Sequence, residues 1–169
     1  LIKSDLTYIG LLCLLNTDFA NHTTPKTVIS TPADIVDPDH QTLIHVSNQN
    51  LDRMNRFLRL WNKTDFTMWE LDLLIMHSDF GKSKIDAAFL INLKQFLSLG
   101  QDLHLKVEQL HAFYSDINTI LRYKTDDFST PEKNLFEDIF LKGTLDEDLK
   151  TDFSLLLSAK TTVFDLVEY

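Results

Sequence analysis

Hydrophobic side chains recur every three or four positions in residues 51–61, and this spacing predicts a helix that is buried on one side. After a short polar turn, Thr67 and Glu70 stand at the spacing of a capping box, in which the hydroxyl accepts an N–H of the new helix and the carboxylate accepts the threonine N–H. A second helix is therefore predicted from there to about residue 76. Apolar residues occupy nearly all of its faces, so we expect it in the core. The apolar face of the first helix comprises Leu51, Met54, Phe57, Leu58, Leu60 and Trp61.

Residues 1–49 combine one helix with a segment that cannot be helical. Thr7 is a suitable N-cap for a short buried helix that ends near Asn16. Three prolines interrupt residues 20–49, which also contain two runs of high β-propensity at 27–29 and 42–46. Residues 26–46 either form a small β-hairpin that lies against the helices or remain an extended loop. The sequence leaves both alternatives open.

The rest of the chain carries further helical patterns. A capping box of Ser83 and Asp86 predicts a helix that ends at Gly100, and a single apolar stripe predicts the next helix from about residue 106 to 121. Thr130 and Pro131 predict the start of a helix that ends at Gly143. A last amphipathic run covers 149–157. These patterns predict an all-α fold, an irregular bundle of about five to seven amphipathic helices.

Composition adds limits on partners. The 169 residues are 44% hydrophobic, enough for one domain with its own core, and we expect 1–169 to be a single helical domain: a helix in 1–19, the loop or hairpin in 20–49 and a bundle in 50–169. The net charge of −9 disfavours nucleic acid. The longest N-terminal apolar run, residues 8–15, is far below the about 20 residues that span a bilayer, so membrane contact is expected only through other regions. The start at Leu1 is typical of a piece of a much longer chain.

Two groups of residues have side chains of the kinds that catalytic or metal sites use. His104, Glu108 and His111 share one helix face, and the last two have the Glu-x-x-His spacing of di-iron bundles, but no second copy faces them. We interpret them as a polar outer face. His77 and Asp79 resemble a base and its orienting acid, yet no motif places a nucleophile, and a histidine that binds last-turn carbonyls is the simpler interpretation. The sequence therefore predicts no catalytic, cofactor-binding or metal-binding residue, and no enzyme.

Three arginines lie next to the apolar face of the 51–61 helix, each at a slightly different angle around the helix. Arg53, Arg56 and Arg59 stand at successive intervals of three, and such a row forms either an interface for carboxylates or ion pairs with the next helix. We favour the second alternative. Our hypothesis is that Arg56 or Arg59 binds Glu70 or Asp72 across the turn.

The central stretch also resembles a known family. The run L-D-R-x-x-R-F-x-R-L-W, followed by a turn and W-E-L-D, is similar to a signature of the A component of bacterial insecticidal toxin complexes, the Tc toxins, and of virulence-plasmid A proteins. Residues 7–19 resemble a T-Y-x-x-L-L-x-L-L-x-T-x-F stretch of that component. Asp65-Phe66 replaces the Gly-Trp that is usual in the family, and Gly10 replaces a glutamate. The motif residues are Leu51, Asp52, Arg53, Arg56, Phe57, Arg59, Leu60, Trp61, Thr67, Trp69, Glu70, Leu71 and Asp72.

The resemblance implies a structural role in the α-helical shell that surrounds a translocation channel. As a whole, such a protein assembles as a pentamer, binds a host cell-surface receptor or glycan through other domains, forms a pore and passes a toxic enzyme supplied by the B and C components. It is secreted or held on the bacterial surface before it reaches the target-cell membrane. The alternative is a free-standing helical module for protein–protein interaction or regulation in virulence.

Overall fold

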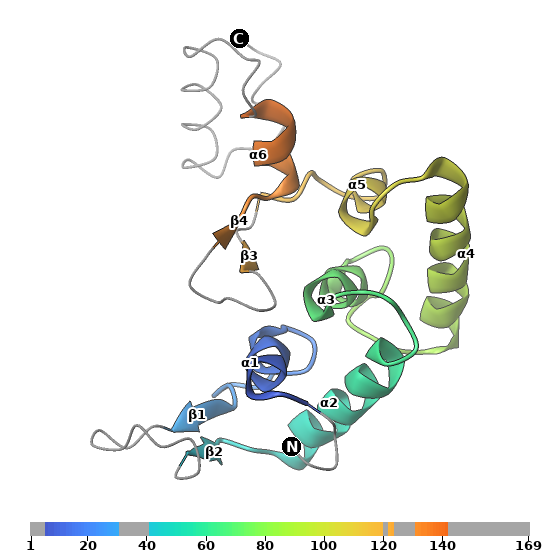
Figure 1. The fold of residues 1–169 in the computed structure, drawn as a ribbon. Helices are drawn as coiled ribbons and strands as arrows, with labels where there is room; N and C mark the ends of the chain where they lie inside the picture. Colours follow the sequence, from blue (N-terminus) through green and yellow to red (C-terminus); the bar gives the residue numbers. More distant parts are fainter. Residues whose placement is uncertain (1–5, 31–40, 120–121, 124–130, 142–169) are drawn as a thin grey trace. The chain divides into compact units, whose positions relative to one another are not determined.

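The computed structural model describes residues 6–30, 41–119, 122–123 and 131–141, and it shows a mostly helical chain with a small antiparallel hairpin (Figure 1). The chain divides into two compact units, residues 1–94 and 95–169, which we describe separately. The single domain expected from length stays a prediction. The elements of the described residues are α1 (Tyr8–Asn16), β1 (Val28–Ser30), β2 (Thr42–Ile44), α2 (Asn48–Trp61), α3 (Met68–Met76), α4 (Ala87–Leu103), α5 (Val107–His111), β3 (Arg122–Tyr123), β4 (Pro131–Glu132) and α6 (Leu135–Phe140).

The first helix begins where the sequence predicts. The Thr7 hydroxyl accepts the Gly10 N–H at 3.0 Å, and α1 ends at Asn16. Its burial is less complete than predicted: Leu14 is buried, whereas Tyr8 and Ile9 are exposed. The helix is therefore held mainly through its C-terminal end and the turn that follows.

The hairpin alternative is confirmed. Strands β1 and β2 pair antiparallel, with Val28 opposite Ile44 and Ser30 opposite Thr42. A two-stranded hairpin is marginally stable alone and needs an external anchor. Thr27, fully buried just before β1, donates its hydroxyl proton to the His45 carbonyl beyond β2 at 3.1 Å. This contact closes the base of the hairpin.

Helices α2 and α3 form the predicted central pair, with one correction. Helix α2 begins earlier than predicted, at a Ser47 cap whose hydroxyl accepts the Asn50 N–H at 3.0 Å. Its buried face is centred on Asn50, Met54 and Phe57, while Leu51 is 50% exposed. The prediction for Leu51 is wrong because the buried amide of Asn50 occupies the inner position at this level of the helix.

The capping box of α3 is confirmed in both halves. Glu70 accepts the Thr67 N–H at 2.9 Å, and the Thr67 hydroxyl accepts the Glu70 N–H at 3.2 Å. The helix is core, as predicted, with Met68, Leu71, Leu74 and Ile75 buried. Trp61 and Trp69 are half-buried, and the Trp61 indole N–H donates to the Phe66 carbonyl at 2.8 Å. The Trp61 side chain of α2 thus binds the backbone of the turn that leads into α3.

The predicted limits of α4 are wrong at both ends. Ser83 does not cap the helix, because its backbone is left-handed, with φ of 56°, and its N–H bonds to the Ile75 carbonyl. Asp86 is the cap, since its carboxylate accepts the Phe89 N–H at 2.9 Å. Helix α4 then continues through Gly100 to Leu103. None of the helices among the described residues is long and apolar enough to cross a membrane.

The second unit departs furthest from the sequence prediction. Helix α5 has only 5 residues, whereas the apolar stripe predicted a helix to Leu121. The helix stops at His111 because the buried Glu108 carboxylate binds groups from beyond it, the Asn118 side-chain N–H at 2.9 Å and the Leu135 backbone N–H at 3.1 Å. Residues 116–119 have no regular secondary structure. Pro131 lies in β4, and Asn134 rather than Thr130 caps α6, its side chain accepting the Glu137 N–H at 2.8 Å. The helix end predicted at Gly143 and the run 149–157 lie outside the described residues.

Candidate functional site

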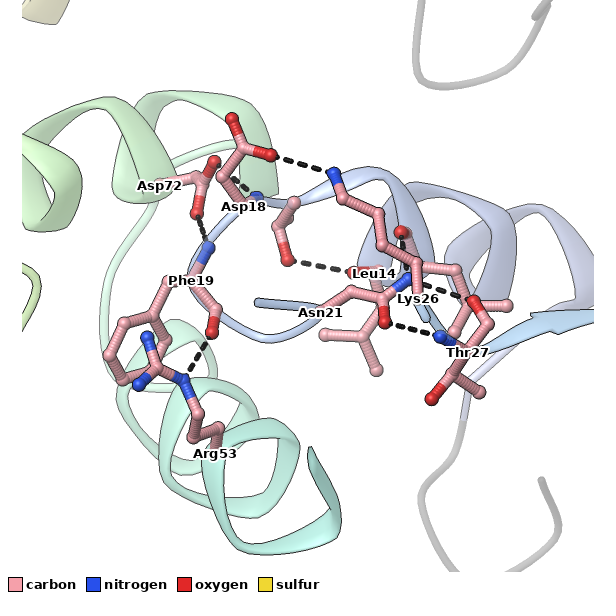
Figure 2. A network of polar contacts seen from close by, with 10 residues as sticks. Leu14, Asp18, Phe19, Asn21, Lys26, Thr27, Arg53 and Asp72 are labelled. Atoms are coloured by element: carbon pink, nitrogen blue, oxygen red, sulfur yellow. Dashed lines mark hydrogen bonds and ion pairs between the residues drawn. The ribbon is translucent and has the colours of Figure 1, made fainter. Parts of the chain in front are cut away.

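The most elaborate polar arrangement in the first unit surrounds residues 17–21, which we call the α1 turn (Figure 2). The Thr17 hydroxyl donates to the Leu14 carbonyl at 2.7 Å, and the Asn21 N–H bonds to the Thr17 carbonyl at 3.2 Å. Phe19 and Ala20 are buried at the centre of the turn. Its peptide groups therefore need partners from neighbouring elements.

Asp72 on α3 supplies two of these partners. One oxygen of its carboxylate accepts the Asp18 N–H at 2.9 Å, and the other accepts the Phe19 N–H at 2.8 Å (Figure 2). Burial raises the pKa of the Asp72 carboxyl from 3.8 to about 6, although the two N–H groups oppose this shift. Desolvation therefore outweighs hydrogen bonding at this carboxyl.

Arg53 on α2 binds a carbonyl group of the same turn. The Arg53 Nε–H donates to the Phe19 carbonyl at 2.6 Å, and the guanidinium carbon lies 4.3 Å from the centre of the Phe19 ring. That ring stacks on Phe57 with a centroid distance of 6.3 Å. Burial is the main cause that lowers the pKa of Arg53, with Arg56 adding to the decrease and Asp72 opposing it. Asp72 and Arg53 thus bind the backbone of Phe19 from two helices, one at its N–H and the other at its carbonyl.

Two buried asparagines bind the base of the hairpin at Thr27, Asn21 from the α1 turn and Asn50 from α2. Asn21 donates to the carbonyls of Leu15 and Thr27 and accepts the Thr27 N–H, each at 2.8 Å. The Asn50 amide donates to the hydroxyls of Thr23 at 2.7 Å and Thr27 at 2.8 Å. Sequence reasoning missed the roles of Asn21 and Asn50. Two signals were available in the sequence. Asn50 continues, one turn earlier, the helix face that carries Met54, and Asn21 follows the predicted end of the first helix.

The hypothesis of arginine ion pairs across the turn is wrong. Within the described part of the chain, Arg56 donates to the Ile85 carbonyl and lies 4.0 Å from Asp52, one turn earlier on the same helix. Glu70 is engaged by its own cap, and Asp72 by the α1 turn. Both carboxylates are satisfied by backbone N–H groups, which are fixed in place at no side-chain entropy cost.

The remaining motif residues differ in how far they are exposed. Leu71 and Phe57 are fully buried, Leu60 and Trp69 are half-buried, and Leu51, Asp52 and Arg59 are exposed. The buried members of the motif thus pack and cap α2 and α3. The exposed members lie on the opposite side of α2.

The histidine predictions need correction. Glu108 and His111 are buried, not part of an outer face, and only His104 is exposed. No group of three or more His, Cys, Asp or Glu side chains that could hold a metal ion occurs in the described ranges. His77 lies at a helix end as predicted, where its Nδ1 accepts the N–H groups of Asp79 and Phe80 at 3.2 and 3.1 Å.

Comparisons with protein-family models, with curated proteins and with solved structures found no match for this chain. The functional interpretation therefore rests on the geometry of the site and on the resemblance of its residues. Asp72 and Arg53, which we call the clamp, join α3 and α2 to the α1 turn through its backbone groups, and Asn21 joins that turn to the hairpin. It is an arrangement suited to holding a scaffold together.

We expect Arg53→Lys to lower the free energy of unfolding by about 1–2 kcal/mol, because lysine cannot both stack on Phe19 and direct a planar N–H at its carbonyl. Arg59→Lys is the matched control, since Arg59 is exposed on the same helix, and we expect a change within about 0.5 kcal/mol. Urea unfolding measures both. Equal stabilities of the two variants would exclude the role assigned to Arg53.

Proposed function

We propose that this chain is a non-catalytic segment of the α-helical shell of a toxin-complex A subunit, folded as an irregular bundle of helices. One observation carries the proposal. The two stretches that separately resemble the toxin family, residues 7–19 and 51–72, meet in space, and motif side chains join them: Arg53 and Asp72 bind the peptide groups of residues 18 and 19, and Phe57 stacks on Phe19. The two stretches that resemble the family are therefore also in direct contact with each other.

The character of the site supports a scaffold role rather than chemistry. Its charged groups, Asp72 and Arg53, bind backbone N–H and carbonyl groups of the same chain. A reactive carboxylate or guanidinium needs access to a substrate, whereas these groups are turned into the protein. In the proposed assembly, the full-length protein is a pentamer that acts with B and C components at the target-cell membrane.

The test is the size and shape of the full-length product from the native reading frame. The proposal predicts a chain of a few thousand residues that negative-stain electron microscopy shows as a bell-shaped pentamer. A reading frame that ends near Tyr169, with a monomeric product, would contradict it and favour a free-standing interaction module.

A further inference from the structure

We propose that the open edge of β2 pairs with the same edge of a second copy of this chain, so that two hairpins form one four-stranded antiparallel sheet. The inference concerns the surface of the hairpin and does not depend on the proposed function. It follows from three properties of β2, which are its accessible edge, its lack of charge and its complementarity to itself.

Strand β2 has one edge that no strand of the described residues covers. Its sheet contains only β1 and β2 among those residues, so the backbone N–H and carbonyl groups of β2 that point away from β1 have no strand beside them. All three residues of β2 are exposed, whereas Ile29 and Ser30 of β1 are half-buried. The edge of β2 is therefore the one that an incoming strand can reach.

The hairpin is held in place before a partner arrives. The buried Thr27 donates its hydroxyl proton to the His45 carbonyl, and the Asn50 amide on α2 donates to the same hydroxyl at 2.8 Å. These bonds fix the base of both strands on the first unit. A strand that is already ordered loses less conformational freedom when it pairs, which favours association.

The edge also lacks the charges that usually protect an unpaired strand. Many proteins place lysine, another charged residue or proline on such an edge to prevent pairing. Residues 27–30 and 41–47 contain no Asp, Glu, Lys, Arg or Pro, although the chain as a whole has a net charge of −9. Two copies of so acidic a chain repel each other, and this repulsion is weakest where both copies contribute an uncharged strand.

The strand is complementary to itself in the antiparallel direction. In a pair centred on Leu43, the Leu43 side chains of the two copies face each other, and Thr42 of each copy faces Ile44 of the other. Leu43 already lies opposite Ile29 of β1. Because cross-strand neighbours share one face of a sheet, the Ile29 and Leu43 side chains of both copies form one apolar row across four strands.

The symmetry of this contact limits the assembly to two copies. Each copy uses the same edge, so the pair is related by a twofold axis and leaves no second β2 edge free to continue. Four strands with an apolar face are also more stable than a two-stranded hairpin, which is marginal alone. The strand has only 3 residues, so the contact is much smaller than the about 1,200 Å² of a standard interface, and we expect a weak dimer.

The pairing is tested by sedimentation velocity of this chain between about 10 µM and 1 mM, where we expect a reversible monomer–dimer equilibrium. Leu43→Lys sets two like charges opposite each other at the twofold axis, and it should raise the dissociation constant of the dimer by at least about 10-fold. Leu51→Lys is the matched control, because Leu51 is a similarly exposed leucine on α2, and it should leave the dimer unchanged.

A mixture of charge variants separates the contact from any effect on folding. Leu43→Lys and Leu43→Glu should each be monomeric alone, and an equimolar mixture should form the dimer again, because opposite charges then face each other across the axis. A parent chain that is monomeric at 1 mM would overturn the proposal. A dimer that Leu43→Lys leaves intact, a mixture that stays monomeric, or a species that grows beyond two copies would overturn it equally.

Discussion

Phe57→Ala should lower the free energy of unfolding by about 3–5 kcal/mol, the range found when a fully buried phenylalanine is truncated. Phe57 is 0% exposed and its ring stacks on Phe19 at an interplanar angle of 28°. The substitution therefore leaves a cavity at the point where α2 meets the α1 turn, and it removes the support of the ring on which Arg53 lies. Urea unfolding followed by circular dichroism measures the loss.

Leu51→Ala is the matched control, because Leu51 belongs to the same sequence motif and the same helix but is 50% exposed. We expect a change within about 0.5 kcal/mol. The comparison separates packing from resemblance, since the motif alone ranks the two residues equally. Similar losses for both variants would show that α2 buries a different face from the one described above.

Gly81→Ala should destabilise the first unit by about 3 kcal/mol or more, through a backbone clash. A Cβ at this position would lie 2.2 Å from the Ile75 carbonyl oxygen and 2.5 Å from the Ile75 Cα. No side chain can rotate away to relieve these contacts, so the turn itself must move. That turn also carries the bond from the Ser83 N–H to the Ile75 carbonyl at 2.9 Å, which ends α3 and redirects the chain towards α4.

Gly100→Ala is the control for a glycine that the structure does not require. A Cβ there would meet the Leu110 side chain at 3.4 Å and the Leu105 carbonyl at 3.6 Å, which are ordinary contacts. Because Gly100 lies inside α4, alanine should be neutral or stabilise by up to about 1 kcal/mol. Thermal unfolding of both variants gives the comparison, and a Gly81→Ala protein as stable as the parent would exclude the close approach at that turn.

Local chemistry explains which elements could be predicted from the sequence. The caps at Thr7 and Thr67 depend on residues within one turn of the chain, so both helix starts are read correctly. The capping pattern at Ser83 fails for a tertiary reason, because a bond to Ile75 holds that residue left-handed. The stripe after Lys106 fails because the buried Glu108 binds the Leu135 N–H and the Asn118 side chain, which both lie beyond the helix.

The clamp itself could not be predicted from residue spacing. The sequence draws attention to the arginine row and to the carboxylates of α3, but it suggests only near partners for them. Asp72 and Arg53 instead bind peptide groups of Asp18 and Phe19, which any sequence would supply. Only the fold shows that the α1 turn brings these groups between α2 and α3.

The stretches 7–19 and 51–72 share one interior, and a double-mutant cycle between Phe19 and Phe57 tests this contact most directly. Phe19→Leu, Phe57→Leu and the double variant are compared by urea unfolding. The stacked pair predicts a coupling energy of about 0.5–1.5 kcal/mol. Losses that add to within about 0.3 kcal/mol would contradict the contact and the scaffold role that rests on it.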